Sequence, residues 1–332
     1  MKQLSIDRMK SLLLILMLWL QALGTACSAT QHSQNKVQRQ PLEKHRREYK
    51  TPAQYEPRDL GYDPKTGEMI TYDHKPRVEL LDEKTGKYAF KWIGYDGKEK
   101  TVIFQRRDVI DVVVSASASK TADGYLYIYE IQNLSTSATY LKRFIVQTFA
   151  ADSEPDRKGA FFPGVMSSAI DEFKDGNWIS FADVSDNVQI DPGQTVRVQL
   201  VSAAAPGLVE CRATAETILE GPGEHMPSVL ENMLPGYKEF PKGHTIGPVD
   251  SLKTLSSQDR VKYLLERLSQ FRKLGWMTEA ASSRYERHLK SNDHSAVFEH
   301  IEQDLKAEQI TTEVFAIIQA MKLSELPAES GL

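Results

Sequence analysis

The sequence predicts a mainly β protein with a C-terminal α part: an antiparallel, Ig-like β-sandwich followed by a small helical bundle. Two observations lead to this fold class. From Asp59 to about Leu219, apolar runs of alternating pattern are separated by short turn sequences, which is typical of antiparallel strands joined by hairpins. From Ser256 onward the apolar period changes from two residues to 3.6, as in amphipathic helices.

Three turn sequences mark the first hairpins. Asp63-Pro-Lys-Thr-Gly67 and Asp82-Glu-Lys-Thr-Gly86 have the same five-residue pattern. In it the aspartate can accept backbone hydrogen bonds and the glycine adopts positive φ without strain. Asp96-Gly97 lies between the strand-like runs Tyr88–Ile93 and Lys100–Phe104, and this dipeptide is a strong hairpin signal. The first part of the body is therefore expected to consist of hairpins.

Five further strands are expected along the chain. They are Val109–Val114, Tyr125–Ile131, Tyr140–Phe149, Trp178–Phe181 and Val196–Val201. In the second of them Tyr127 and Tyr129 share one face, while Leu126 and Ile128 share the other. Because no helical segments intervene, these strands favour a sandwich or an open barrel over a parallel sheet.

Part of this region resembles a known group of proteins. The residues Asp191-Pro-Gly-Gln-Thr195, the strand after them, Ser202 and Ala205-Pro-Gly207 are similar to a stretch of about 100 residues in uncharacterised exported bacterial proteins with Ig-like sandwiches. The resemblance implies the fold class, and it implies no activity.

The first 29 residues are predicted to be a signal peptide. Lys2, Arg8 and Lys10 give a positively charged start, and residues 11–23 form an apolar run broken only by Gln21. A helix of that length rises about 20 Å, whereas a bilayer core is roughly 30 Å thick. We therefore expect removal of this segment and an extracytoplasmic protein, located in the periplasm, in the outer membrane as a lipoprotein, or outside the cell.

Two processing routes remain open around Cys27. The small residues Gly24-Thr25-Ala26 suit an ordinary signal peptidase that cuts after Ala26 or Ala29. Cys27 is also a candidate for lipidation, because its surroundings resemble the lipobox of bacterial lipoproteins, although Leu23 stands one position too early. Contact with a membrane is expected only through such an anchor. Cys211 is the second of the two cysteines and is expected to be a lone thiol.

Residues 30–57 are expected to be a disordered basic linker. Residues 31–58 carry a net charge of +4, whereas residues 59–332 carry −10. The linker has few apolar side chains, so it cannot offset its own ordering entropy. A basic spacer can also touch anionic lipid, glycopolymer or nucleic acid. We favour the solvated spacer and expect no nucleic-acid partner.

The body is expected to divide near Asp250. Residues 58–250 would form the β-sandwich domain with its N-terminal hairpins, and residues 251–325 the helical bundle, with few contacts between the two. The Gly- and Pro-rich passage up to Pro248 is expected to be a loop wrapped against the sandwich. Four helices are expected, and their predicted capping residues are Ser256, Thr278, Asp293 and Thr311.

The sequence holds no strong catalytic or metal-binding motif. It lacks a Gly-Lys-Ser/Thr phosphate loop, a Gly-x-Ser-x-Gly elbow, a His-Glu-x-x-His pair and a Cys-x-x-Cys pair. We therefore assign no catalytic residue, metal or cofactor, and the ligand-binding residues are unknown. His288, His294 and His300 are expected to face solvent, and carboxylate pairs such as Asp171-Glu172 carry no argument among 45 acids.

Three short motifs of the penicillin-binding and serine β-lactamase families occur in the chain. They are Ser117-Ala-Ser-Lys120, Ser185-Asp186-Asn187 and Lys84-Thr85-Gly86. In those families the Ser-x-x-Lys motif comes first and opens a helix, so that the lysine lies one turn from the nucleophile. Here Lys-Thr-Gly comes first, in a predicted turn, and Ser117 follows a Val-rich strand. Chance assembly from common turn residues is the better explanation.

Aromatic residues at predicted strand ends and in loops are candidates for a sugar-binding platform. They are Trp92, Tyr95, Phe161, Phe162 and Trp178. Core packing is the favoured alternative, because large aromatic side chains usually pack in cores.

The leading functional expectation is an exported, non-catalytic envelope or secreted protein that binds or scaffolds, with an envelope protein or polysaccharide as partner. The alternative is an extracytoplasmic hydrolase of an envelope polymer, with a site that is not recognisable from sequence. A component of a surface or secretion assembly is a third class.

Overall fold

The computed structural model describes twelve segments of the chain. They are residues 36–37, 39–43, 58–62, 66–73, 75–94, 96–150, 153–155, 177–182, 189–215, 219–220, 240–291 and 294–321. The predicted signal peptide, Cys27, most of the predicted basic linker and residues 221–239 lie outside them.

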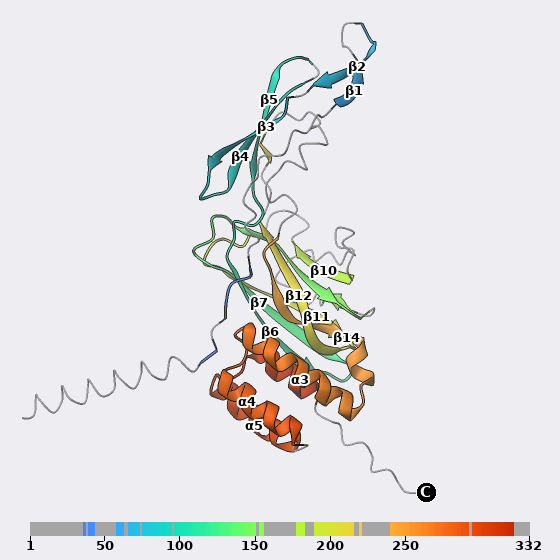
Figure 1. Cartoon of the computed structure of the whole chain (residues 1–332), viewed down its shortest axis with the longest axis vertical. Coiled ribbons are helices and arrows are strands. Elements are labelled where there is room, and N and C mark those ends of the chain that lie inside the picture. Colours follow the sequence, from blue (N-terminus) through green and yellow to red (C-terminus); the bar gives the residue numbers. More distant parts are fainter. Residues whose placement is uncertain are drawn as a thin grey trace, which may run out of the picture.

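The described chain is mainly β with C-terminal helices, as predicted. Its strands form one two-stranded and three four-stranded sheets, all antiparallel, and four α-helices follow. In Figure 1 the hairpin sheets lie at one end, the sandwich lies in the middle, and the helices lie at the other end.

The hairpins come first in the chain. β1 (Arg58–Tyr62) pairs with β2 (Met69–Asp73), while β3 (Arg77–Asp82), β4 (Lys87–Ile93) and β5 (Glu99–Gln105) form a sheet completed by β13 (Leu219–Glu220). In the turn before β4, the Asp82 carboxylate accepts hydrogen bonds from Lys84 N–H (2.9 Å) and the Thr85 hydroxyl (2.6 Å). Gly86 and Gly97 have φ of 62° and 74°, as both predicted turns require.

Two four-stranded sheets form the sandwich. One has the order β10 (Asn177–Ala182), β8 (Leu141–Thr148), β12 (Ala205–Ala215) and β14 (Lys242–Val249). The other has the order β6 (Val112–Lys120), β7 (Tyr125–Asn133), β11 (Thr195–Ser202) and β9 (Glu154–Pro155).

Aromatic side chains join the two sheets. The ring centroid of Tyr129 on β7 lies 5.7 Å from that of Phe144 and 6.0 Å from that of Phe181 on the facing sheet. The Tyr129 hydroxyl donates a hydrogen bond to the carbonyl oxygen of Ile246 on β14 (3.1 Å). Tyr127, on the same face of β7, is also fully buried, which confirms the predicted alternation of that strand.

The interpretation of residues 243–248 as part of a loop was wrong, because they belong to strand β14. Their glycines serve close packing between segments. A Cβ on Gly243 would lie 2.3 Å from Leu42 Cδ2, and one on Gly247 would lie 2.8 Å from the Gln147 carbonyl oxygen. A side chain at Gly247 would collide with backbone, and one at Gly243 would displace Leu42, so the glycines that suggest a loop instead let this strand approach its neighbours.

The helical part follows the short 3-10 helix η2 (Asp250–Thr254). Its helices are α3 (Ser257–Lys273), α4 (Glu279–Lys290), α5 (His294–Lys306) and α6 (Thr312–Met321). Two predicted caps are confirmed, since the hydroxyls of Ser256 and Thr278 accept hydrogen bonds from the N–H groups of Asp259 (3.2 Å) and Ala281 (3.3 Å).

The other two predicted caps differ. Asp293 lies outside the described residues. Thr311 does precede α6, but its buried hydroxyl has no hydrogen-bond partner in the described part of the chain. The predicted side-chain cap at Thr311 is therefore wrong, because the hydroxyl is buried without accepting a hydrogen bond from the first turn of α6.

The helices and the sandwich share one apolar core. Leu264 and Leu268 of α3 and Ile317 of α6 belong to the same continuous cluster of buried side chains as Tyr129 and Ile246 of the sandwich. Helix α6 packs directly on β6 and β12. The expectation that few contacts cross a boundary near Asp250 was therefore wrong, because α6 buries its apolar face against the sheets.

Residues 39–43 are also part of the fold. Leu42 is buried, and its N–H donates to the Val112 carbonyl oxygen on β6 (2.8 Å). Glu43 exchanges two backbone hydrogen bonds with Lys242 on β14 (2.6 and 2.8 Å). For these residues the prediction of a disordered linker was wrong. The linker is polar on average, but it contains one apolar residue, Leu42, whose side chain is buried where the edge strands β6 and β14 meet.

Candidate functional site

The outer edge of β3 exposes two adjacent leucines. β3 is the last strand of its sheet among the described strands. Its register against β4 shifts between Leu80 and Asp82, so Leu81 is the extra residue of a β-bulge. The bulge brings two neighbouring side chains to the surface, and Leu80 and Leu81 are each 53% exposed. Sequence analysis missed them, although a Leu-Leu pair before a turn aspartate was the available signal.

Charged side chains accompany the leucines on this sheet. Arg77 bridges to Glu99 (2.6 Å), and Lys91 bridges to Glu79 (2.6 Å). The hydrogen bond from Lys91 holds the pKa of the Glu79 carboxyl below its ordinary value. An apolar pair beside a row of paired charges has the composition of a protein-binding surface, with an apolar centre and a polar rim.

The sheet that carries this edge has its own core. Tyr88, Phe90, Trp92, Val102 and Phe104 form a second cluster of buried side chains, separate from that of the sandwich. The rings of Phe90 and Phe104 pack edge to face, with centroids 6.4 Å apart. The edge strand β3 thus belongs to a sheet with its own packed core, and this core fixes the positions of the exposed side chains on β3.

The two described members of the predicted aromatic platform are buried. Trp92 lies in the core of the hairpin sheet and is 3% exposed. Trp178 is also buried, and the guanidinium of Arg212 lies over its ring, 4.4 Å from the centroid. Both therefore pack in the protein interior. Tyr95, Phe161 and Phe162 lie outside the described residues.

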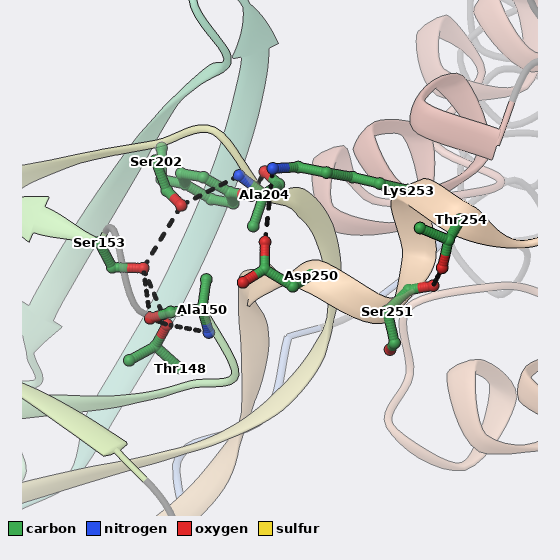
Figure 2. Close-up of polar contacts among 10 residues, drawn as sticks. Thr148, Ala150, Ser153, Ser202, Ala204, Asp250, Ser251, Lys253 and Thr254 are labelled. Atoms are coloured by element: carbon green, nitrogen blue, oxygen red, sulfur yellow. Dashed lines mark hydrogen bonds and ion pairs between the residues drawn. The ribbon is translucent and has the colours of Figure 1, made fainter.

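A cluster of hydroxyl groups closes one end of the sandwich (Figure 2). The hydroxyls of Thr148 and Ser153 lie 2.9 Å apart, and Ser153 also reaches the Ser202 hydroxyl (3.4 Å) and the Ala150 carbonyl oxygen (3.4 Å). The Ser202 hydroxyl accepts a hydrogen bond from Ala204 N–H (3.1 Å). The partners of Ser153 are carbonyl and hydroxyl oxygens, which are poor general bases. This cluster ties β8 to β11, and its contacts are structural.

A part-buried ion pair joins the two ends of the described chain. The Arg39 guanidinium binds both carboxylate oxygens of Glu313, at 2.6 and 3.0 Å. Glu313 lies in the first turn of α6 and is 1% exposed. Beside this pair, a cleft of about 230 Å³ lies between residues 39–43, β14 and the end of α3, and Lys242 and Lys273 are among its lining residues.

The remaining predicted positions divide into described and undescribed ones. His288 and His300 are partly exposed, with ring centroids 6.2 Å apart. Nothing is described of the side chain of His294. Ser117–Lys120 ends strand β6, and Lys84–Gly86 lies in the turn before β4, so neither has the setting of the penicillin-binding motifs.

Other positions named from the sequence are not described. Ser185–Asn187, Asp171-Glu172 and Cys27 all lie outside the described residues. Within the described segments, no group of three His, Cys, Asp or Glu residues is placed to hold a metal ion. No helix in that part of the chain is both long enough and apolar enough to span a bilayer.

Cys211 is a buried free thiol on β12. Burial, with smaller contributions from Glu210 and Glu313, raises its pKa far above the ordinary value of 9.0. Below pH 9 the thiol is protonated in both the folded and the unfolded chain, so its contribution to stability is fully present. Above pH 9 only the unfolded thiol ionises. The free energy of unfolding should then fall by about 1.4 kcal/mol per pH unit from this group.

The test is urea unfolding of the wild type and Cys211→Ala between pH 8 and pH 10. The variant should lack the part of the decline that begins near pH 9, before most tyrosines ionise. Equal slopes in the two proteins would show that Cys211 does not control the alkaline response.

No family model, curated protein or solved structure matches this chain at a significant level.

Proposed function

We propose that this chain is an exported, non-catalytic protein that binds or scaffolds another protein of the cell envelope. The observation that carries the proposal is the open edge of β3, with Leu80 and Leu81 both 53% exposed. Export rests on the charged and apolar pattern of residues 1–29. A membrane anchor, if one is attached, would be at Cys27.

An edge strand offers unpaired N–H and C=O groups, to which an extended strand of a partner can add. The bulge and the neighbouring charges of Arg77 and Glu79 limit unspecific edge pairing, as they do in many proteins. The two leucines would supply the apolar contact, and the paired charges would form the rim. The partner that fits this surface is a protein with an exposed strand.

The test is affinity capture from the envelope fraction with the full mature chain as bait. Each buried leucine contributes about 1.5–3 kcal/mol, so Leu80→Asp with Leu81→Asp should reduce recovery of a specific partner at least about tenfold. Val201→Asp is the matched control, because Val201 is apolar and 39% exposed but lies on β11 of the sandwich. It should leave recovery unchanged.

Equal recovery with the leucine variant and the wild type would contradict the proposed surface. Hydrolysis of an envelope polymer or acyl ester by the purified chain, abolished by one point substitution, would instead support the hydrolase alternative.

A further inference from the structure

Residues 36, 37 and 39–43, which we call the strap, contact both the helices and the sandwich. Lys36 bridges to Glu308 (3.0 Å), and Val37 N–H donates to the Glu308 carbonyl oxygen (3.1 Å). Further along the strap Arg39 pairs with Glu313 on α6. The strap ends between the two sheets, where its backbone bonds to β6 and β14.

Together with α6, the strap completes the outer edge of β6. The groups satisfied there are Val112 C=O, Val114 C=O and Ala116 N–H, which alternate along the strand. They bind Leu42 N–H (2.8 Å), Arg39 Nη1 (3.1 Å) and the Glu313 carboxylate (2.5 Å), respectively. One backbone donor, one guanidinium donor and one carboxylate acceptor thus occupy the places that an added strand would fill.

We infer that the strap is a closing device, which covers the edge of β6 and locks α6 onto the sandwich as a single unit. This inference goes beyond the proposed binding function, because it concerns the edge of β6 in the sandwich and the regulation of its exposure. When the strap is open, the carbonyl groups of Val112 and Val114 on β6 lose their strap partners, and the cleft beside Lys273 loses the wall that the strap supplies.

Two anchors make the strap cooperative. The first is Arg39, whose partner Glu313 is almost fully buried. If Arg39 leaves, the Glu313 carboxylate remains in the interior without its counter-ion, which is strongly unfavourable. The second is Leu42, which sits where Gly243 has no Cβ. The two anchors are only three residues apart on one extended segment, so displacement of either should loosen the other.

The test is native-state hydrogen exchange of the full mature chain, followed by mass spectrometry. Arg39→Ala removes the first anchor. Gly243→Val displaces the second, since a Cβ at this position meets Leu42 at 2.3 Å, and the next residue that it approaches is Cys211 on β12. Both variants should accelerate exchange in the same three segments, namely residues 39–43, 112–116 and 312–316, by about tenfold or more. Lys36→Ala is the control, because the Lys36–Glu308 pair is half-exposed, and its exchange should match the wild type.

Acceleration of residues 312–316 by Gly243→Val is the decisive result, because the atoms nearest to the added Cβ belong to Leu42 and Cys211 and not to α6. If Gly243→Val changes exchange only near residues 39–43 and β14, the strap does not act as a unit and the inference is wrong. It is also wrong if either variant accelerates all segments equally, since that indicates global unfolding.

Discussion

Leu268→Asp should unfold the sandwich together with the helices, in one cooperative transition at lower urea concentration. Leu268 lies in α3, is 4% exposed, and belongs to the core cluster that also contains the sandwich side chains. The substitution removes an apolar side chain that costs about 2–5 kcal/mol to lose. It also places a carboxylate in the apolar core cluster, which adds a further penalty. The sum is a large fraction of the 5–15 kcal/mol that typically stabilises a domain.

Two probes separate the alternatives. Far-ultraviolet circular dichroism reports the helices, and labelling of the buried Cys211 thiol reports opening of the sandwich. In Leu268→Asp the urea midpoints of the circular dichroism transition and of the Cys211 labelling transition should fall by the same amount. Glu266→Ala, an exposed position of the same helix, should change stability by less than about 0.5 kcal/mol. A lower helical midpoint with unchanged Cys211 labelling would show that the helices form an independent domain.

Tyr129→Ala should destabilise the protein by about 3–5 kcal/mol, the range for truncation of a large buried aromatic side chain. Tyr129 has no exposed surface and packs against two rings of the facing sheet. Tyr129→Phe keeps the ring but leaves the Ile246 carbonyl oxygen without its donor, so it should cost about 1–2 kcal/mol. Urea unfolding measures both differences.

Tyr125→Phe is the control, because Tyr125 lies on the same face of β7 but is only half-buried. Its substitution should cost less than that of Tyr129→Phe. If Tyr129→Ala costs no more than Tyr129→Phe, the ring does not hold the two sheets together, and the sandwich core lies elsewhere.

The features that sequence analysis predicted correctly are those with local causes. The turn at Asp82–Gly86, the caps at Ser256 and Thr278, and the alternation of β7 each depend on residues within a few positions of one another. A backbone conformation or a cap needs no distant partner. Such signals are therefore readable in a single sequence.

The features that were missed have distant causes. Gly243 was taken as a loop signal, although it is small because Leu42, about 200 positions earlier, packs against it. Arg39 was counted as one of several linker charges, although its partner Glu313 lies 274 positions later. Glu313 itself offered a signal, because it is the only charged residue in the apolar helix α6. The exposed Leu80 and Leu81 could be read from the sequence, but their exposure depends on a bulge.

The strap also has a consequence for the order in which the protein is made. Arg39 leaves the ribosome early, whereas Glu313 is synthesised 274 residues later. At roughly 5–20 residues per second, the interval is on the order of 10 to 60 seconds. β6 is synthesised only up to Lys120 during the first part of that interval, and for the rest of it the edge of β6 has neither Glu313 nor α6 to cover it. The nascent chain therefore exposes an edge strand that can pair with other chains until α6 has been synthesised. A chaperone would be needed during this period.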